Sequence, residues 1–362
     1  MNFPTKYHQI IERIDAINPI AYSKTRNYTD GAVTRLSPYI SRGVISLPMI
    51  KNAILKKYDL YQSEKLLQEL AWREYWLRVW ESKGDKIFTD LSKKESEVQT
   101  NEIPVSIMNA NTGIKAIDKS IRELYETGYM HNHCRMYVAS IVCNIAKTHW
   151  LTPSRWMYYH LLDGDLASNS LSWQWVAGTF SSKKYYCNQD NINKYCHTDQ
   201  RQTFLDKSYD ELPHSEIPLS LRNMLLLTLE TKLPKLPLPL INRNYPTLIY
   251  NSYNLDPLWY SGEKANRILL LEPSHFKKFP VNEKVLEFIL ALSTNIADIK
   301  IFVGEFQILA NHTNNSKMIF KKHPTCNHYK GEAESYNYLF PEISGYFPSF
   351  FSYWKKCKKF LI

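Results

Sequence analysis

Hydrophobic side chains recur every three to four positions through most of residues 1–210, and this period predicts a mainly helical region. The clearest case is the segment after Ser63, where Leu66, Leu70 and Leu77 fall on one helix face. The Ser63 hydroxyl stands where it can cap the free backbone N–H groups of a helix start. We therefore expect an amphipathic helix over residues 63–80.

Three later segments of the same region follow the helical pattern. Residues 112–127 carry isoleucine and leucine at helical spacing and stop at Gly128, a residue type that commonly ends helices. Residues 131–150 are apolar on most faces, which predicts a buried helix. A third helix is expected over residues 152–162, opened by a Thr-Pro pair and broken by the Asp-Gly-Asp sequence of residues 163–165.

The pattern changes in the last third of the chain. Prolines punctuate residues 211–257, which predicts a linker that wraps a surface. Beyond the linker, short apolar runs of strand type surround a helical segment at residues 281–295. These runs are residues 267–271, 300–303 and 318–320. We predict a mainly α fold with a helical domain at 1–210, the linker, and a small α/β (βαβ-like) region at 258–362.

Composition narrows the class of protein. The chain has 362 residues, of which 44% are hydrophobic, so it can bury a sizeable core and is not a disordered protein. Glycine is scarce, with 11 residues, which argues against a glycine-rich nucleotide-binding chain. No apolar run approaches the roughly 18 residues that cross a membrane. The first residues also lack the apolar segment of a signal peptide.

Charge and cysteine content bear on the partner and the compartment. The net charge of +10 suits a polyanionic partner, although many basic proteins bind none, and the excess is spread thinly, so any nucleic-acid site must be assembled by the fold. The six cysteines form no CxxC pair, and we expect reduced thiols in a cytoplasmic protein. Cys187 and Cys196 as metal or cluster ligands are the less favoured alternative.

Three stretches place unusual polar residues inside otherwise apolar helices. In the first, residues 32–43, Thr34 and Ser37 offer hydroxyl groups and Arg35 offers a cation just before an apolar segment. A helix start with free N–H groups can hold a phosphate, although an ordinary helix cap has the same appearance. The second stretch puts Glu69 on the same helix face as a tryptophan and an arginine, which alone would suggest a surface ion pair.

The third stretch runs from Asn132 to Trp175. Asn132, Arg135 and Met136 share a helix face by their spacing. Residues 163–175 then contain two carboxylates, an asparagine and two tryptophans. Polar groups in such apolar surroundings need partners, and a large polar ligand would supply them.

Taken together, these stretches resemble the FAD-binding domain of the photolyase/cryptochrome family over about residues 20–200. Four ordered motifs carry the resemblance: TRLSPYIS, ELAWREYW, YMHNHCRM and HLLDGDLASNSLSWQWVAG. It implies a folded FAD whose reduced form donates an electron when it absorbs light. The matching cofactor positions are Tyr22, Thr34, Arg35, Leu36, Ser37, Arg135, Asp163, Gly164, Asp165 and Asn169. In the family the matching arginine pairs with the first aspartate, and the residue matching Asn169 faces flavin N5.

The resemblance also implies a path for electrons. Trp173 and Trp150 match the first two members of the family's hopping chain, although each could be ordinary core. The usual third tryptophan falls near Glu97, where there is none. The surface end of the path then passes through another aromatic residue, Trp156 or Tyr158, or is missing.

The implied substrate is DNA that contains pyrimidine dimers. Residues matching the cyclobutane-dimer pocket are Glu69, Trp72, Asn132, Met136 and Trp175. Two tryptophan faces can stack on a flipped pyrimidine pair, while a carboxyl and an amide read its polar edges. Enzymes for the (6-4) photoproduct place histidines where the Asn and Met stand, so cyclobutane dimers are favoured. Arg26 and Arg73 are candidates for phosphate contacts.

The expected activity is that of a deoxyribodipyrimidine photo-lyase, a carbon–carbon lyase that acts as a monomer. The expected catalytic residues are Glu69, Asn132, Asn169, Trp173 and Trp150. No antenna domain is expected before the flavin domain, and no second chromophore is predicted. The alternative is a cryptochrome-like blue-light sensor that binds FAD without repairing DNA, with the C-terminal region as its signalling module.

Overall fold

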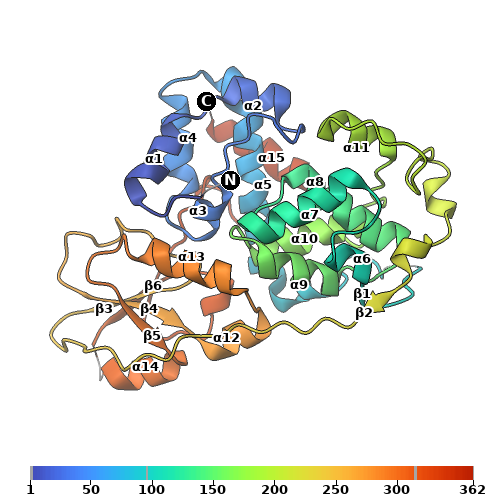
Figure 1. Ribbon diagram of the computed structural model, residues 1–362. Coiled ribbons are helices and arrows are strands. Elements are labelled where there is room, and N and C mark those ends of the chain that lie inside the picture. Colours follow the sequence, from blue (N-terminus) through green and yellow to red (C-terminus); the bar gives the residue numbers. More distant parts are fainter. Residues whose placement is uncertain (1–2, 95–96, 314–315, 362) are drawn as a thin grey trace.

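The computed structural model describes residues 3–94, 97–313 and 316–361. Helices form one region, and a smaller region with a parallel sheet lies beside it (Figure 1). The helical region contains α1 (Tyr7–Asp15), α2 (Pro19–Thr25), α3 (Ser37–Ser41), α4 (Leu47–Leu55), α5 (Leu60–Lys83), α6 (Val105–Met108), α7 (Lys115–Thr127), α8 (Asn132–Ala139), α9 (Leu151–His160), α10 (Leu166–Ala177) and α11 (Gln189–Cys196). The predicted fold class, a mainly helical part followed by a small α/β part, is confirmed.

The long helix α5 begins earlier than predicted. Asp59 caps it, because its carboxylate accepts a hydrogen bond from the backbone N–H of Gln62 at 2.8 Å, and the Gln62 side chain accepts one from the N–H of Asp59 at 3.2 Å. Ser63 is buried inside the helix, and its hydroxyl has no hydrogen-bond partner among the described residues. The expectation that Ser63 caps this helix is therefore wrong.

The predicted helix over residues 131–150 is interrupted. Regular α8 ends at Ala139, and a π-helical turn follows over Ser140–Ile145. The Asn144 amide donates to the backbone oxygens of Val176 and Tyr185, at 3.1 and 2.7 Å. Lys147 then adopts a positive φ of 55°, which no regular helix allows. The apolar pattern predicted the burial correctly but not the break.

The neighbouring helix ends are closer to prediction. Helix α7 ends at Gly128, whose φ of 72° lies in the left-handed region, as the sequence predicted. Helix α9 begins at Leu151, before the expected Thr-Pro start, and ends at His160. The Asp-Gly-Asp sequence separates α9 from α10, as expected.

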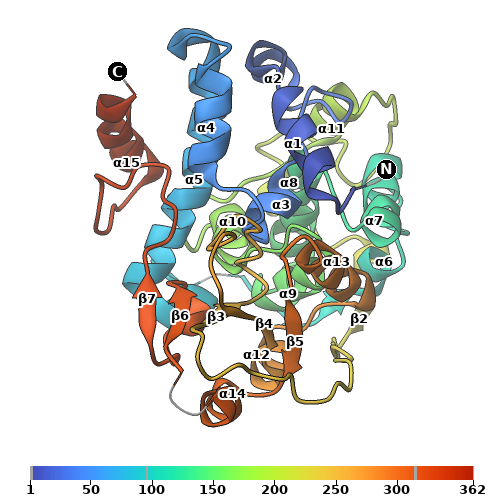
Figure 2. The ribbon, with the colours of Figure 1, turned by 90° about the vertical axis from the view of Figure 1, so that its left-hand side faces the viewer.

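The second region contains a five-stranded parallel sheet in the order β5-β4-β3-β6-β7. Its strands are β3 (Thr247–Tyr250), β4 (Asn266–Leu271), β5 (Lys300–Val303), β6 (Met318–Lys321) and β7 (Glu332–Glu334). Helices α12 (Pro273–Lys278), α13 (Glu283–Ser293) and α14 (Phe306–Thr313) accompany this sheet, whereas α15 (Phe350–Cys357) packs on α5 of the helical region. Helix α13 lies on the side toward the helical region and α14 on the opposite side (Figures 1 and 2).

Two strands lie in the segment predicted as linker. Short strand β2 (Met224–Leu225) pairs antiparallel with β1 (Ile103–Pro104) and so fixes the segment to the helical region. Strand β3 forms the centre of the sheet, and all of its residues are buried. The sequence analysis missed β3 because a four-residue run after Pro246 is too short to show a period.

The two regions pack directly on each other through buried polar side chains. Arg42 is fully buried, and its guanidinium donates to the backbone oxygen of Leu162 in the helical region at 3.0 Å and to that of Ser252 beside the sheet at 3.5 Å. Glu74 of α5 accepts hydrogen bonds from Arg78 at 3.0 Å and from the Tyr353 hydroxyl of α15 at 2.6 Å, and it accepts one from the backbone N–H of Leu339. The C-terminal segment is therefore held against α5 by satisfied hydrogen bonds.

Candidate functional site

An ion pair between a buried carboxylate and a partly exposed guanidinium lies where three predicted cofactor residues meet. Asp163 is 4% exposed, and its two carboxylate oxygens accept hydrogen bonds from Nη2 of Arg135 at 3.0 and 2.9 Å. The Ser37 hydroxyl donates to the same carboxylate. Burial alone would raise the pKa of Asp163, but Arg135 and Ser37 outweigh burial and hold this pKa below its ordinary value. The carboxylate is therefore fixed in place and charged at neutral pH.

A second set of contacts joins this ion pair to the next aspartate. Ser41, one turn after Ser37 on α3, donates to the backbone oxygen of Asp163 and accepts from Nη2 of Arg73, both at 2.8 Å. Nη1 of Arg73 lies 3.4 Å from Asp165, which also caps α10. Arg73, predicted as a phosphate contact, thus binds a cofactor-site carboxylate in this structure. The sequence analysis missed Ser41, although its spacing from Ser37 was a signal.

Arg35 combines an unusual backbone with an unsatisfied side chain. Its φ of 53° lies in the left-handed region, which non-glycine residues rarely adopt. Its Nε is buried and has no hydrogen-bond partner among the described residues. Its charge acts on Tyr129 and His131, so the predicted phosphate segment lies close to the start of α8. Burial, followed by the charge of His133, lowers the pKa of His131 to about 4, so this imidazole is neutral at pH 7.

A third group of predicted residues meets between α2 and α5. Nε of Arg26 lies 3.5 Å from Glu69, and Nζ of Lys65 lies 2.9 Å from the same carboxylate oxygen. Burial, and then the charge of Glu69, raises the pKa of Tyr22. Tyr22, Arg26 and Glu69 are therefore neighbours, and the Glu69 carboxylate is 30% exposed. Sequence reasoning missed Lys65, although it lies one turn before Glu69.

The tryptophan predicted to stack on the substrate is already stacked. Trp72 and Phe350 of α15 lie with ring centroids 3.7 Å apart and planes 10° apart. One face of the indole is thus covered by the C-terminal helix, and the rings of Tyr75 and Trp76 also lie against Trp72, at centroid distances of 5.8 and 5.1 Å. No sequence signal near Trp72 pointed to Phe350, because the contact joins opposite ends of the chain.

The other predicted dimer-pocket residues are more open. Asn132 is exposed at the first position of α8, and Met136 is half-buried one turn later. Trp175 of α10 is 36% exposed and lies 5.8 Å from the ring of Tyr185. Within the described residues, no hydrogen bond or ring contact connects these three side chains to Glu69 or Trp72.

Comparison with known proteins identifies the core of this site. Residues 66–234 match the family model described as the FAD binding domain of DNA photolyase. These residues belong to the photolyase family's FAD-binding domain. The matched range contains most of α5, all of α8 and α10, and both aspartates of the site, and FAD is the cofactor of this domain.

Relatives of this chain are similar to it over part of their length. A deoxyribodipyrimidine photo-lyase of Streptomyces griseus is 30% identical over 161 residues, 42% of this chain and 35% of the relative. A cryptochrome DASH of Synechocystis sp. is 30% identical over 167 residues, 43% of this chain and 34% of the relative. The crystal structure of a Synechocystis cryptochrome matches with 26% identity and a TM-score of 0.48, covering 54% of this chain and 44% of that one. The chain thus spans less than half the length of these proteins.

The donor atoms at the predicted cofactor segments fit an anionic, polar ligand. Three buried polar atoms near these segments have no hydrogen-bond partner among the described residues: Nε of Arg35, Nε2 of His131 and Oγ of Ser168. Buried polar groups in native proteins are normally paired. A dinucleotide with a diphosphate and ribose hydroxyls offers the acceptors and donors that these atoms lack.

The predicted electron path runs through the core of the photolyase domain. Trp173 is 2% exposed and Trp150 is fully buried, and both belong to one hydrophobic cluster. Nε1 of Trp150 donates to Asp90 at 2.7 Å, a residue that sequence reasoning missed. Trp156 and Tyr158 are also buried, so neither reaches solvent as an expected surface end would. Glu97 is exposed and pairs with Lys147 and Lys184.

The residue predicted to face flavin N5 lies beside a hollow. Nδ2 of Asn169 donates to the backbone oxygen of Ser154 at 2.9 Å, which fixes the amide. Together with Tyr158, Leu166 and Phe279, Asn169 lines a hollow of about 320 Å³, open solvent included. One of the two amide N–H groups is therefore used by the protein, and the second N–H and the amide oxygen are left for a ligand.

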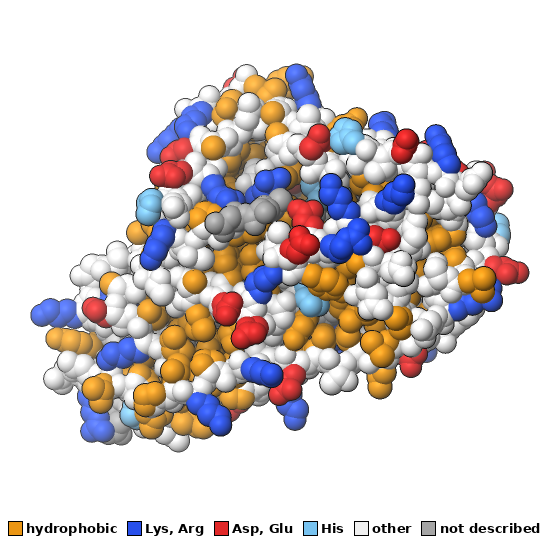
Figure 3. Space-filling model, viewed as in Figure 1, with side chains coloured by type: hydrophobic (Ala, Val, Ile, Leu, Met, Phe, Trp, Pro, Cys, Tyr) orange, Lys and Arg blue, Asp and Glu red, His pale blue; other side chains and the backbone are white. Residues whose placement is uncertain are grey.

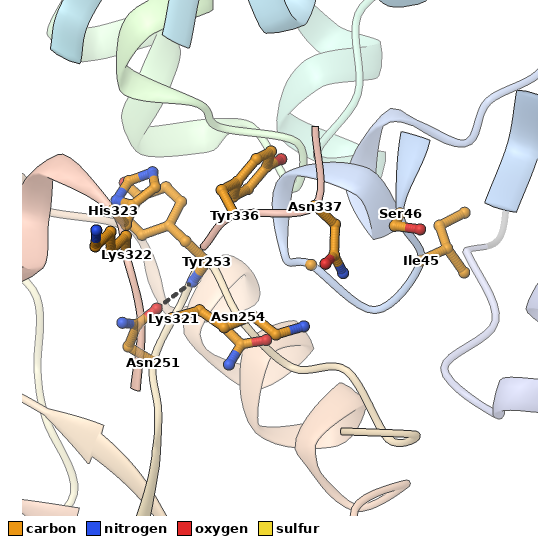
Figure 4. Close-up of a pocket in the computed structure, with 11 residues that line it drawn as sticks. Ile45, Ser46, Asn251, Tyr253, Asn254, Lys321, Lys322, His323, Tyr336 and Asn337 are labelled. Carbon is orange, nitrogen blue, oxygen red and sulfur yellow. Dashed lines mark hydrogen bonds between the residues drawn. The ribbon is translucent and has the colours of Figure 1, made fainter. Parts of the chain in front are cut away.

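A larger hollow joins the two regions (Figure 4). It lies at the carboxyl ends of β3 and β6 and has a volume of about 420 Å³, open solvent included. Tyr253 and His323 stack with centroids 4.4 Å apart, and burial lowers the pKa of His323 to about 4. Ile45 and Ser46 of the helical region complete the lining.

Surface charge and potential metal ligands do not indicate a further binding site. Basic and acidic side chains are interspersed over the face shown in Figure 3. The described residues contain no group of three or more histidine, cysteine or carboxylate side chains that could hold a metal ion. All six cysteines, Cys187 and Cys196 included, are free thiols. In the described part of the chain, no helix is both long and apolar enough to span a bilayer.

Proposed function

We propose that this chain repairs DNA in light by splitting cyclobutane pyrimidine dimers with an electron from reduced FAD. The observation that carries the proposal is the Asp163–Arg135 ion pair next to the unpartnered Arg35 Nε. A reduced flavin is an anion, and a buried anion needs cations and hydrogen-bond donors nearby. Within a domain whose family binds FAD, these residues meet that need.

We call the residues expected to hold FAD the flavin cradle: residues 34–37 with Arg135, Asp163 and Asn169. Each of them has a separate role in this proposal. Thr34, Arg35 and Ser37, with the backbone of residues 34–37, would hold the diphosphate. Arg135, kept in position by Asp163, would supply the cation for the flavin ring, and Asn169 would contact its N5. When bound, reduced FAD would supply the electron that light transfers to the dimer. Electrons would pass inward from Trp150 to Trp173 and then to the cofactor, which would restore the reduced state.

The dimer would be held against Glu69 and Trp72 of α5 together with Asn132, Met136 and Trp175, a surface that we call the open, or dimer-binding, face. Trp72 and the exposed ring of Trp175 would stack on the extruded bases, and Met136 would line the apolar base of the pocket. Glu69 and Asn132 would hydrogen-bond to the polar edges of the bases. Arg26, now paired with Glu69, would be available for a phosphate once the carboxylate turns to the base.

The second candidate function is a flavin light sensor without repair activity. The stacking of Phe350 on Trp72 favours it, because half of the predicted stacking surface is already covered. The similarity to a cryptochrome DASH is compatible with either function. The two functions differ in one measurable way, since only the repair enzyme consumes dimers.

The deciding experiment is illumination of the reduced, FAD-loaded protein with an oligonucleotide that contains one thymine dimer. Repair predicts that dimers disappear under blue or near-ultraviolet light and persist in the dark, as measured by chromatography of the digested DNA. Arg135→Ala, which should lose FAD, is the matched inactive control. If the parent protein holds reduced FAD, binds damaged and undamaged DNA equally and splits no dimers, the sensor function replaces the proposal.

A further inference from the structure

We propose that the outward face of helix α15 is a DNA-docking surface, in which Phe351 stacks on a base next to the lesion and Lys355, Lys356 and Lys359 contact phosphates. This inference rests on the proposed function, because it names how the same substrate is held. It concerns residues outside the range that matches the photolyase family model.

Helix α15 has one buried apolar face and one exposed face that carries lysines. The inward stripe of Phe350, Tyr353, Trp354 and Cys357 is buried at helical spacing. The outward face carries Phe351, which is 69% exposed, followed by the lysines. A helix needs only the first stripe to pack, so packing leaves the exposed phenylalanine unexplained.

The inward stripe fixes the helix beside the predicted dimer pocket. Tyr353 donates to Glu74, and Phe350 stacks on Trp72. At the other end of α15, Lys358 pairs with Glu64 at 2.8 Å. Helix α15 therefore runs along α5 at the edge of the molecule, as Figure 2 shows, and its outward face is presented in a fixed orientation.

The position of Phe351 connects this face to the lesion. Its ring lies 6.5 Å from Trp72 in an edge-to-face arrangement, while most of its surface is open to solvent. A base next to a dimer that stacks on Trp72 would meet Phe351. Aromatic platforms of this kind bind unstacked bases without sequence preference.

The charge of the outward face is unbalanced. Among the described residues, no carboxylate lies within ion-pair distance of Lys355, Lys356 or Lys359. Phe351 and Lys355 are one turn apart, about 6 Å along the helix axis, so a base and a neighbouring phosphate of one strand can contact both. Lysines interleaved with an exposed aromatic ring are typical of surfaces that follow a nucleic-acid strand.

A membrane surface is the other anionic partner that a basic amphipathic helix can bind. Such helices insert their apolar stripe between lipids. In α15 that stripe is already buried against α5, and Phe351 is the one aromatic ring of the helix left exposed. The observations therefore favour DNA.

The test compares FAD-loaded parent protein with the double variant Lys355→Ala/Lys356→Ala. Binding to a dimer-containing oligonucleotide and to its undamaged counterpart is measured between 50 and 200 mM salt, conditions that expose phosphate contacts. Loss of two phosphate contacts should weaken binding to both oligonucleotides and lower the slope of log K against log salt by roughly 1.4–1.8. The matched control, Lys232→Ala/Lys235→Ala, removes the same charge from the exposed extended segment far from α15 and should keep the parent slope.

Phe351 is tested by two substitutions. Phe351→Ala should weaken binding to the damaged oligonucleotide about 5- to 150-fold, the equivalent of one lost base stack, with an unchanged salt slope. Phe351→Tyr should restore most of the affinity. Flavin absorbance and the melting temperature of each variant show whether α15 is still folded.

The outcomes separate this inference from the proposed function. If the parent splits dimers but the α15 variants bind and respond to salt as the parent does, the docking surface is overturned and the repair function stands. If the parent neither binds nor splits damaged DNA, both fail. If Lys355→Ala/Lys356→Ala reduces binding to phosphatidylserine-containing vesicles but not to DNA, the surface binds membranes and the inference is wrong.

Discussion

The predicted flavin cradle and the predicted dimer-binding face are built in different ways, although α5 contributes to both. In the cradle, Asp163 is 4% exposed and its hydrogen-bond partners are supplied by α3 and α8. On the dimer-binding face, the Glu69 side chain is 30% exposed and forms ion pairs with both Arg26 and Lys65. Asn132 and Trp175 are exposed there.

This difference separates two kinds of recognition. Buried, mutually paired groups hold their positions before a ligand arrives, which suits a cofactor that stays bound. Exposed charge pairs contribute little stability and rearrange easily, which suits a substrate that comes and goes. Changes in the cradle should therefore affect folding and cofactor binding, and changes on the open face should affect only DNA.

The largest expected effect is in the cradle. Asp163→Ala leaves the Arg135 guanidinium without its partner, and we expect a loss of about 3–5 kcal/mol in the free energy of unfolding. The purified variant should also lose most of its FAD, measured by absorbance and by urea unfolding. Glu69→Ala on the open face is the control and should cost less than about 1 kcal/mol. Equal losses in the two variants would contradict the distinction between the two sites.

Acid should weaken the cradle through the same carboxylate. Because the pKa of Asp163 is held below its ordinary value of 3.8, its pairing stabilises the fold above that value, and this stability is lost as the pH falls through the lowered pKa. Asp163→Asn should therefore remove part of the acid sensitivity of unfolding below about pH 4. The measurement is the free energy of unfolding against pH, and identical curves for variant and parent would show that other groups cause the acid loss.

The next effect concerns electron supply to the cradle. Trp173→Phe keeps an aromatic ring in the core but makes oxidation of the side chain harder, so flavin photoreduction should slow by at least about tenfold, an added barrier of about 1.4 kcal/mol. Dimer repair by chemically pre-reduced protein should persist. Trp80→Phe, at a tryptophan that is 3% exposed in the other hydrophobic cluster, is the control and should photoreduce at the parent rate. A slow Trp156→Phe variant with a fast Trp173→Phe variant would move the path to Trp156.

On the open face, Trp72 should determine the affinity for damaged DNA. Trp72→Ala should weaken binding to dimer-containing DNA about 5- to 150-fold at fixed salt, because a base stack is lost. Binding to undamaged DNA and its salt dependence should stay the same, since phosphate contacts are kept. Fluorescence anisotropy with both oligonucleotides measures the difference. A parallel loss for both oligonucleotides would mean that Trp72 supports the fold and does not read the lesion.

The smallest expected effect on binding is at Glu69. Glu69→Gln keeps the shape but removes the charge, and it should lower the repair yield per photon more than it lowers affinity. The reason is that the carboxyl group would act on the dimer after electron transfer, as the reaction proceeds, rather than on the bound ground state. Yield and affinity are measured on the same oligonucleotide, and a change in affinity alone would assign Glu69 to binding only.

Local spacing in the sequence determined much of the helical region. The period of apolar residues predicted a helix within α5 and the end of α7 at Gly128 correctly. The motifs also named Arg135 and Asp163, and the structure contains their ion pair. The helix features could be predicted because each depends on residues within one helix, whereas the ion pair joins two motifs and was expected from the family resemblance. The start of α5 at Asp59 was missed, because several polar residues near a helix start can act as caps and only the backbone geometry selects one.

Tertiary structure alone decided which residues meet across the chain. Ser41 links Arg73 to Asp163, and Phe350 covers one face of Trp72, yet neither contact follows from any period or motif. The central strand β3 likewise owes its place to neighbours on both sides rather than to its own short sequence. The physical reason is that burial and hydrogen bonding are satisfied by whichever groups the fold brings together, so partners far apart in the chain are chosen by packing. The sequence by itself determined the helices and the residue types of the cradle, and the fold determined how open the dimer-binding face is.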